Sequence, residues 1–99
     1  MAKVTWTIQS LDDLTAIAEY HETTSPDYAA LLIGDIFAVE QQLASFPVSG
    51  RIVPEANIST FREIVVRGYR VIYAHVDYES VNILAIRSSR IPLGGIGLL

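Results

Sequence analysis

The chain has 99 residues, which is the length of one small domain. Apolar residues make up 51% of it and charged residues 18%, a balance that excludes an intrinsically disordered chain. The longest stretch without a charge is the ten residues from Gln41 to Gly50, whereas a bilayer-crossing helix needs roughly 18 apolar residues. We therefore expect a soluble protein with no membrane association. Because no signal-peptide pattern is present at the start, we expect it in the cytoplasm.

The residues that usually hold metals are scarce. The chain has no cysteine, which excludes disulfides, thiolate catalysis and sulfur-ligated zinc. Its two histidines, His21 and His75, lie in segments of different character and lack the spacing of a metal-binding pair. We expect neither a metal site nor a cofactor.

The net charge of −4 is unevenly distributed. Residues 1–50 carry one lysine and seven acidic residues, whereas residues 51–99 carry six arginines and four acidic residues. Every basic residue after Lys3 is an arginine, the side chain that binds carboxylates and phosphates in a bidentate manner. The sequence therefore predicts a basic, arginine-bearing second half. Its positive charge does not show in the net charge, because the first half is more strongly acidic.

The N-terminal segment predicts a strand followed by a helix. Residues 3–9 alternate between apolar and polar side chains, as a half-buried strand does. Ser10 is placed to cap a helix, with Asp13 as the acid of its first turn. Apolar residues then recur at three-and-four spacing as far as His21, and we expect the helix to end near residues 22–24.

A second helix is predicted from residue 26. Ser25 supplies a capping hydroxyl, Pro26 suits the first helical position, and Asp27 is an acid in the first turn. The apolar residues that follow mark one face of a helix, which Phe46 and Pro47 terminate. The short connection between the two segments predicts an antiparallel helical hairpin.

The second half predicts a loop and three strands. Residues 47–60 contain glycine, proline and asparagine and are predicted to be a loop. Residues 62–67, 69–76 and 81–87 are rich in valine, isoleucine and tyrosine, and the short connections between them indicate an antiparallel meander. The order predicts an α+β fold: an N-terminal strand, then an antiparallel helical hairpin packed on a small antiparallel sheet. We expect one domain over residues 1–90 and an apolar, glycine-containing tail over residues 91–99.

Six sequence motifs, in order along the chain, resemble the RelE/ParE toxins of type II toxin–antitoxin systems. They are V-T-W-T-x-x-S-L-D-D-L-x-x-I-x-x-Y from residue 4, S-P-D-Y-A from 25, F-P-x-x-G-R-x-V-P-E from 46, F-R-E-I from 61, G-Y-R-V-I-Y from 68 and N-I-L-A-I-R-S-S-R from 82. The resemblance covers the chain from Val4 to about Arg90. It implies the β-α-α-β-β-β fold of this family and a toxin neutralised by a cognate antitoxin. The assembly expected is a hetero-oligomer with that antitoxin, and a homodimer is an alternative.

The resemblance leaves two activities open, one enzymatic and one not. RelE-like toxins cut messenger RNA on the ribosome, and the residues that match this activity are Arg70, Arg87 and Arg90, with Glu63 as a candidate base. No lysine follows Lys3, and no tyrosine or histidine follows Tyr78 to supply the usual acid or base. An arginine cannot replace such a tyrosine or histidine, because its guanidinium group does not readily exchange protons. No catalytic residue is therefore assigned, and whether the chain is an enzyme stays open.

The motifs F-P-x-x-G-R-x-V-P-E and F-R-E-I are closer to the ParE side of the family, whose members arrest growth by inhibiting DNA gyrase. We therefore expect a ParE-like gyrase inhibitor, with ribosome-dependent messenger cleavage and a decayed, inactive toxin as the alternatives. The candidates for contact with the target are arginines of the second half: Arg62, Arg67, Arg70, Arg87 and Arg90.

Several of these side chains also have a structural interpretation. Arg62 with Glu63, and Arg51 with Glu55, are spaced to form ion pairs at the surface. By alternation, Arg70 would share a face of its strand with Ile72 and could pair with an acid of the helices. The sequence does not decide between these roles and target binding.

Overall fold

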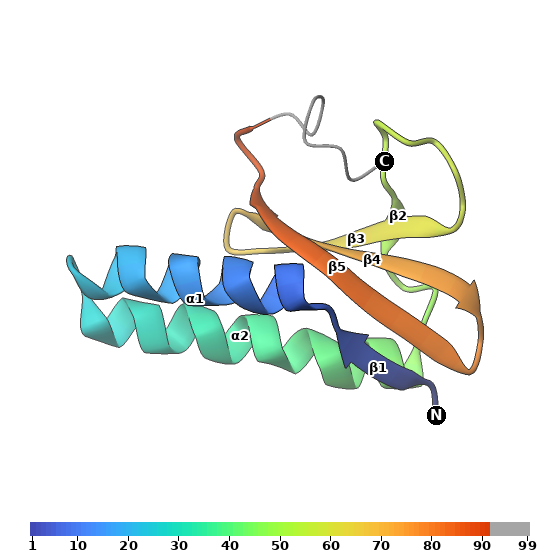
Figure 1. Cartoon of the computed structure of the whole chain (residues 1–99), viewed down its shortest axis with the longest axis horizontal. Coiled ribbons are helices and arrows are strands. Elements are labelled where there is room, and N and C mark those ends of the chain that lie inside the picture. The colour runs from blue at the N-terminus through green and yellow to red at the C-terminus, as the bar shows by residue number, and fades with distance from the viewer. Residues whose placement is uncertain (92–99) are drawn as a thin grey trace.

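The structure is a computed structural model that describes residues 1–91 (Figure 1). Its elements are β1 (Lys3–Trp6), α1 (Ile8–Glu22), α2 (Pro26–Ser45), β2 (Arg51–Ile52), β3 (Phe61–Val66), β4 (Tyr69–Asp77) and β5 (Ser80–Ser88). The two helices run side by side along one face of the sheet, which confirms the predicted α+β architecture. Apart from Ile91, the predicted C-terminal tail lies outside the described residues. Within residues 1–91, neither helix combines the length and apolar character that crossing a membrane requires.

The sheet has five strands in the order β1-β5-β4-β3-β2. Strands β3, β4 and β5 form the predicted antiparallel meander, and β2 extends it antiparallel to β3. Strand β1 pairs in parallel with β5, which makes the whole sheet mixed rather than purely antiparallel. Parallel neighbours require a long crossover, and here the helical hairpin and the other strands lie between β1 and β5 in the chain.

The prediction for the start of α1 is wrong by one turn. Strand β1 ends at Trp6, and Thr7 is the N-cap, because its side chain accepts a hydrogen bond from the backbone N–H of Ser10 at 3.2 Å. Ser10 lies inside the helix, where it is buried and its hydroxyl donates to the carbonyl of Thr7 at 2.8 Å. Asp13 is consequently beyond the first turn and is free to contact β5.

The predicted boundaries of α2 are confirmed. The side chain of Ser25 accepts from the backbone N–H of Tyr28, Pro26 is the first helical residue, and Asp27 lies in the first turn. The helix ends at Ser45, immediately before the predicted Phe46–Pro47 stop.

The main core lies between the helices and the inner face of the sheet, by which we mean the face that the helices cover. Its fully buried members come from α2, β4 and β5: Leu32, Ile36, Leu43, Val71, Tyr73, Val81 and Ile83. A second, smaller core lies on the outer face, where Val53 and Ile72 are buried against Ala56 and Phe61. The loop over residues 47–60 therefore covers part of the outer face, and its two-residue strand β2 was not predicted.

Gly50 marks a close approach between this loop and the sheet. Its backbone N–H donates to the hydroxyl of Tyr73, a fully buried side chain, at 3.0 Å. A Cβ atom at Gly50 would lie 2.6 Å from the carbonyl oxygen of Glu63 and 2.7 Å from the Tyr73 hydroxyl. Only glycine therefore fits where the loop reaches the sheet.

We predict that Gly50→Ala destabilises the fold by about 2 to 3 kcal/mol, because the methyl group forces the loop away from β3 and strains its bond to Tyr73. The matched control is Gly34→Ala, since an added Cβ there has no heavy atom within 4 Å and the position lies inside α2. That variant should gain up to about 1 kcal/mol from helix propensity. Urea denaturation measures both, and equal stabilities of the two variants would contradict this account.

Candidate functional site

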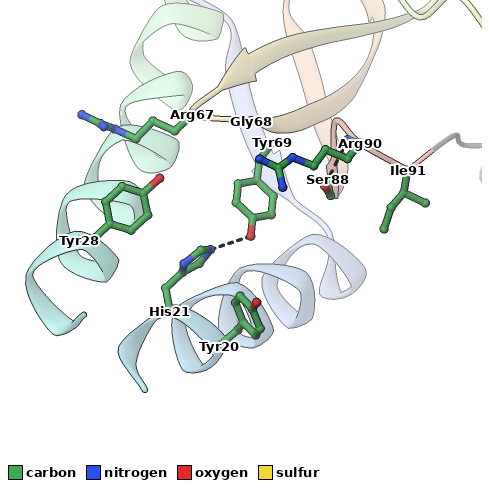
Figure 2. Close-up of a pocket in the computed structure, with 9 residues that line it drawn as sticks. All are labelled: Tyr20, His21, Tyr28, Arg67, Gly68, Tyr69, Ser88, Arg90 and Ile91. Carbon is green, nitrogen blue, oxygen red and sulfur yellow. Dashed lines mark hydrogen bonds between the residues drawn. The ribbon is translucent and has the colours of Figure 1, made fainter. Parts of the chain in front are cut away.

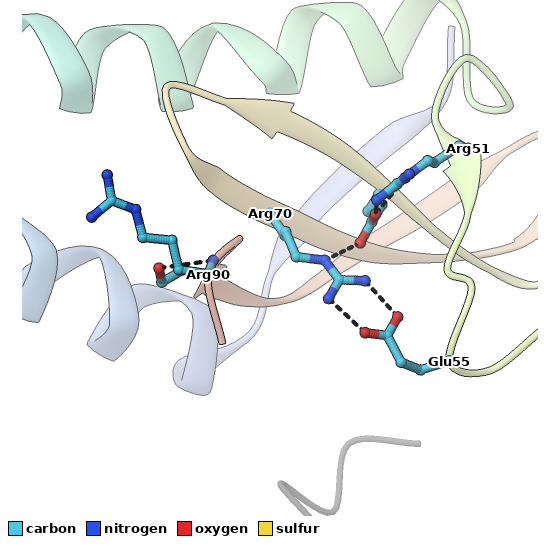
Figure 3. Close-up of polar contacts among 6 residues, drawn as sticks. Arg51, Glu55, Arg70 and Arg90 are labelled. Atoms are coloured by element: carbon cyan, nitrogen blue, oxygen red, sulfur yellow. Dashed lines mark hydrogen bonds and ion pairs between the residues drawn. The ribbon is translucent and has the colours of Figure 1, made fainter. Parts of the chain in front are cut away.

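Two arginines and two glutamates form a continuous set of ion pairs on the outer face, in the order Arg51, Glu63, Arg70 and Glu55; we call it the arginine–glutamate chain. Nε of Arg70 donates to Oε1 of Glu63 at 2.5 Å, and Arg51 binds Oε2 of the same carboxylate. The two terminal nitrogens of Arg70 donate to the two oxygens of Glu55 at 2.7 and 2.8 Å, as a bidentate pair (Figure 3). The arginine–glutamate chain joins β2, β3, β4 and the loop, and its two positive charges are matched by two negative charges.

The centre of the arginine–glutamate chain is out of reach of solvent. The Glu63 side chain is 0% exposed and that of Arg70 is 7% exposed. Hydrogen bonds to Glu55, and then to Glu63, raise the pKa of Arg70 despite its desolvation, so it stays charged. Both oxygens of Glu63 accept from guanidinium groups and the side chain is buried, so Glu63 is not exposed to take a proton from a substrate in this structure.

The ion pairs differ from those that the sequence suggested. Arg62 and Glu63 are adjacent in a strand and therefore point to opposite faces of the sheet. Nη1 of Arg62 donates to the carbonyls of Gly50 at 3.0 Å and Val48 at 3.4 Å, so this arginine holds the loop. Arg70 lies on the outer face beside Ile72, as alternation predicts, but its partners come from β3 and the loop. The suggested pairing of Arg70 with an acid of the helices is wrong.

Arg87 is also held by an ion pair. Its Nη1 donates to Oδ2 of Asp13 in α1 at 2.6 Å, and the same oxygen accepts from the backbone N–H of Ile86 at 2.9 Å. β1 pairs with β5 only as far as Ile83, so Asp13 satisfies the edge of β5 beyond that point. Asp13 thus ties α1 to the end of the sheet and occupies Arg87.

Arg67 lies at the tip of the β3–β4 hairpin. Arg67 and Gly68 are the two turn residues, and both have positive φ, 47° and 84°, as a type I′ turn requires. Nε of Arg67 donates to Asp35 of α2 at 2.6 Å, and both side chains remain about two-fifths exposed. This hydrogen bond is the main reason that the pKa of Arg67 is raised.

A pocket of about 470 Å³ lies between the tip of the helical hairpin and the β3–β4 turn (Figure 2). We call it the hairpin pocket. Its lining residues come from α1, α2, the β3–β4 turn, the start of β4, and the end of β5 with the residues after it: Tyr20, His21, Tyr28, Arg67, Gly68, Tyr69, Ser88, Arg90 and Ile91. The pocket brings together Arg67 and Arg90, two of the predicted target-binding arginines, and leaves out Arg62, Arg70 and Arg87.

A histidine and a tyrosine connect the two layers inside the hairpin pocket. Nε2 of His21 and the hydroxyl of Tyr69 are 2.8 Å apart, as the dashed line in Figure 2 marks. Burial, and then the neighbouring Tyr20 and Tyr28, raise the pKa of Tyr69, so it stays neutral at physiological pH. No local sequence pattern predicts this contact, because the two residues are 48 positions apart.

The described residues do not form a cluster of metal ligands. Among residues 1–91, no group of three or more histidine or acidic side chains is placed to hold a metal ion. Among the arginines of the second half, Arg62 and Arg90 form no ion pair with a described carboxylate. Arg62 is held by backbone carbonyls instead, so Arg90 is the one whose side chain has neither kind of partner among the described residues. Figure 3 shows Arg90 pointing away from the arginine–glutamate chain.

A family model and two similar proteins all indicate the toxins of type II toxin–antitoxin systems. The family model described as the ParE toxin of a type II toxin–antitoxin system, parDE, matches residues 4–92. "Toxin RelE2" of Caulobacter vibrioides is 37% identical over 87 residues, which cover 88% of this chain and 94% of the relative. "Putative toxin Y4kP" of Sinorhizobium fredii is 31% identical over 84 residues, covering 85% of this chain and 84% of that protein.

A solved structure supports the fold. The structure described as the chromosomal ParDE TA system from P. aeruginosa superposes with a TM-score of 0.72 at 21% identity, over 89% of this chain and 96% of the other. At this identity the likeness concerns the fold. The relatives carry both RelE and ParE names, so the names do not specify a target.

The arginine–glutamate chain predicts a large cost for removing its central cation. Arg70→Ala should destabilise the protein by about 3 to 5 kcal/mol, because it leaves Glu63 buried and deprived of one of its two partners. Arg67→Ala, which breaks the exposed pair with Asp35, should cost less than about 1 kcal/mol. Urea denaturation distinguishes the two, and the interpretation fails if both variants lose the same small amount.

The buried tyrosines predict a loss of stability at alkaline pH. Burial raises the pKa of Tyr73, against the opposing effects of the Gly50 N–H and the charge of Arg62, and the pKa of Tyr69 is raised as well. Both folded-state values exceed the unfolded value, so the free energy of unfolding should be unaffected by these groups below about pH 10 and should fall above it. Tyr69→Phe and Tyr73→Phe should each reduce the fall between about pH 9 and pH 11, measured by urea denaturation. An unchanged pH dependence in both variants would contradict the assignment.

Proposed function

The chain belongs to the ParE toxin family of type II toxin–antitoxin systems, and from this premise we propose that it arrests growth by inhibiting DNA gyrase. Membership of the family implies a cognate antitoxin that neutralises the toxin. Gyrase is the target that we infer for this member, and contact with it requires an exposed binding surface rather than a hydrolytic site.

The observation that carries the proposal is the state of the residues that match a ribonuclease site. Metal-free cleavage of RNA needs a base for the ribose hydroxyl and an acid for the leaving oxygen. Here Glu63 is buried with both oxygens bound to arginines, and Arg70 is bound to two carboxylates. Arg87 is bound to Asp13. Three of the four matching residues thus support the fold, and the fourth, Arg90, forms no ion pair within the described residues. This state favours a toxin that acts by binding.

Messenger cleavage remains the alternative, and one comparison favours it. The relative at 37% identity is named "Toxin RelE2", and RelE-like toxins are the members of the family that cut messenger RNA. If this chain were an endoribonuclease, Arg70 or Glu63 would have to leave its present partners when RNA binds. The two activities are therefore separable by experiment.

We assign the target-binding surface to Arg67 and Arg90. Arg67 is at a turn tip and about two-fifths exposed, and Arg90 is exposed and has no ion pair within the described residues. Charged groups at such positions raise association rates and form charge-assisted hydrogen bonds to a partner. We propose that the antitoxin binds through apolar contacts rather than through these arginines, because large apolar residues such as Ile8, Phe46 and Val76 are exposed.

The test is to run two assays in parallel on toxin that has been separated from its antitoxin: gyrase supercoiling and ribosome-dependent cleavage of messenger RNA. We predict inhibited supercoiling with intact messenger. Arg67→Ala and Arg90→Ala should each weaken inhibition by about tenfold, the effect of one lost charge-assisted contact.

The control is Lys3→Ala, an exposed cation on β1, which should inhibit as the parent protein does. Cleaved messenger together with unaffected supercoiling would overturn the gyrase proposal. Inhibition that survives in Arg67→Ala and Arg90→Ala would show that the binding surface is elsewhere.

A further inference from the structure

The lining of the hairpin pocket has a chemical bias that gyrase contact alone does not explain. It contains two guanidinium groups, three phenol rings and one imidazole. None of its lining residues within the described chain is an aspartate or glutamate. Its volume of about 470 Å³ lies within the range of pockets that bind small molecules. The pocket is therefore suited to a ligand that has both an anionic and a planar aromatic part.

The anion would bind at Arg90. Arg67 already donates to Asp35, whereas no described carboxylate pairs with Arg90. Figure 2 shows Arg90 extending from the end of β5 toward Tyr69, with Ser88 beside it. The hydroxyl oxygen of Ser88 accepts a hydrogen bond from the backbone N–H of Arg90 at 3.3 Å, and its proton remains available to a ligand. An arginine and a hydroxyl are both donors to phosphate oxygens, and no carboxylate among the described lining residues competes with such an anion.

The planar part would bind at Tyr20. The ring of His21 is held edge-on by its neighbours, with ring centroids 5.0 Å away for Tyr20, 5.4 Å for Tyr28 and 5.9 Å for Tyr69. This cluster fixes the rings, yet Tyr20 is 71% exposed and retains an open surface. Nucleic acid bases stack on such rings regardless of sequence.

We propose that the hairpin pocket binds a nucleotide, with its phosphate at Arg90 and Ser88 and its base against Tyr20. The nucleotide could be a free nucleoside phosphate or part of a single-stranded nucleic acid, since both present the same base and phosphate. An acidic peptide would pair with Arg90, but it has no planar group to stack on the exposed ring of Tyr20. The inference goes beyond the gyrase proposal and is measured without gyrase, so either can fail while the other stands.

The experiment is isothermal titration of the full chain with four probes: adenosine monophosphate, a short oligothymidylate, inorganic phosphate and a polyglutamate peptide. We expect one of the first two to bind more tightly than phosphate or polyglutamate, and the tighter one identifies the source of the nucleotide. Arg90→Gln should weaken that binding by about tenfold, and Tyr20→Ala by at least about fivefold.

The controls match the variants in exposure and chemistry. Tyr78→Ala removes a tyrosine that is 70% exposed at the β4–β5 turn, and Lys3→Gln removes an exposed cation on β1. Both should bind the nucleotide as the parent does, and circular dichroism should show all four variants folded. The proposal is overturned if neither nucleotide probe binds, if polyglutamate binds instead, or if phosphate binds as tightly as the nucleotide. It is also overturned if the control variants lose as much affinity as Arg90→Gln and Tyr20→Ala.

Discussion

The guanidinium group of Arg70 is the point on which the outer half of the molecule depends. It lies almost out of contact with solvent and binds one carboxylate from the neighbouring strand and another from the loop. A buried charge must be paired, because its desolvation costs several kcal/mol. Glu63 is consequently fixed against Arg70 on one oxygen and Arg51 on the other, and Glu55 holds the loop against the sheet. The short strand β2 and the small core around Ile72 follow from this arrangement.

This constraint also bears on function. Three of the four positions that resemble a ribonuclease site, Glu63, Arg70 and Arg87, form ion pairs within the fold, so their charges are neutralised there. Arg90, which forms no ion pair within the described residues, lies instead at the hairpin pocket, together with Arg67 and its exposed pair to Asp35. Arg90 therefore presents a positive charge without a described carboxylate partner, and it points away from the arginine–glutamate chain (Figure 3).

The sequence predicted those features that local periodicity and local capping determine. The helical hairpin and the meander follow from apolar spacing, and Ser25 with Pro26 located the start of α2 correctly. The start of α1 was misplaced because Thr7 and Ser10 are both good capping residues, and only the end of the pairing between β1 and β5 decides between them. Pairing of that kind depends on residues nearly 80 positions apart, which no local pattern encodes.

The sequence predicts which residues belong to the candidate site but not which of them contact one another. The sequence identified the arginines of the second half, yet it could not assign their partners, since neighbours along a strand point to opposite faces. Arg62 and Glu63 therefore never meet, whereas Arg70 and Glu63 do so across two strands. The contact between His21 and Tyr69 has the same origin: it exists only because the tip of the helical hairpin lies beside the start of β4.

We infer that Arg70 and Glu63 serve the fold and not the chemistry of the toxin. Growth arrest in cells that produce the double variant Arg70→Met/Glu63→Met without antitoxin tests this inference. Two apolar side chains of similar size remove both buried charges together. The partners left behind, Arg51 and Glu55, are partly exposed to solvent, so we expect a folded variant that still arrests growth. A variant that is folded by circular dichroism, accumulates to the parent's level and no longer arrests growth would contradict it.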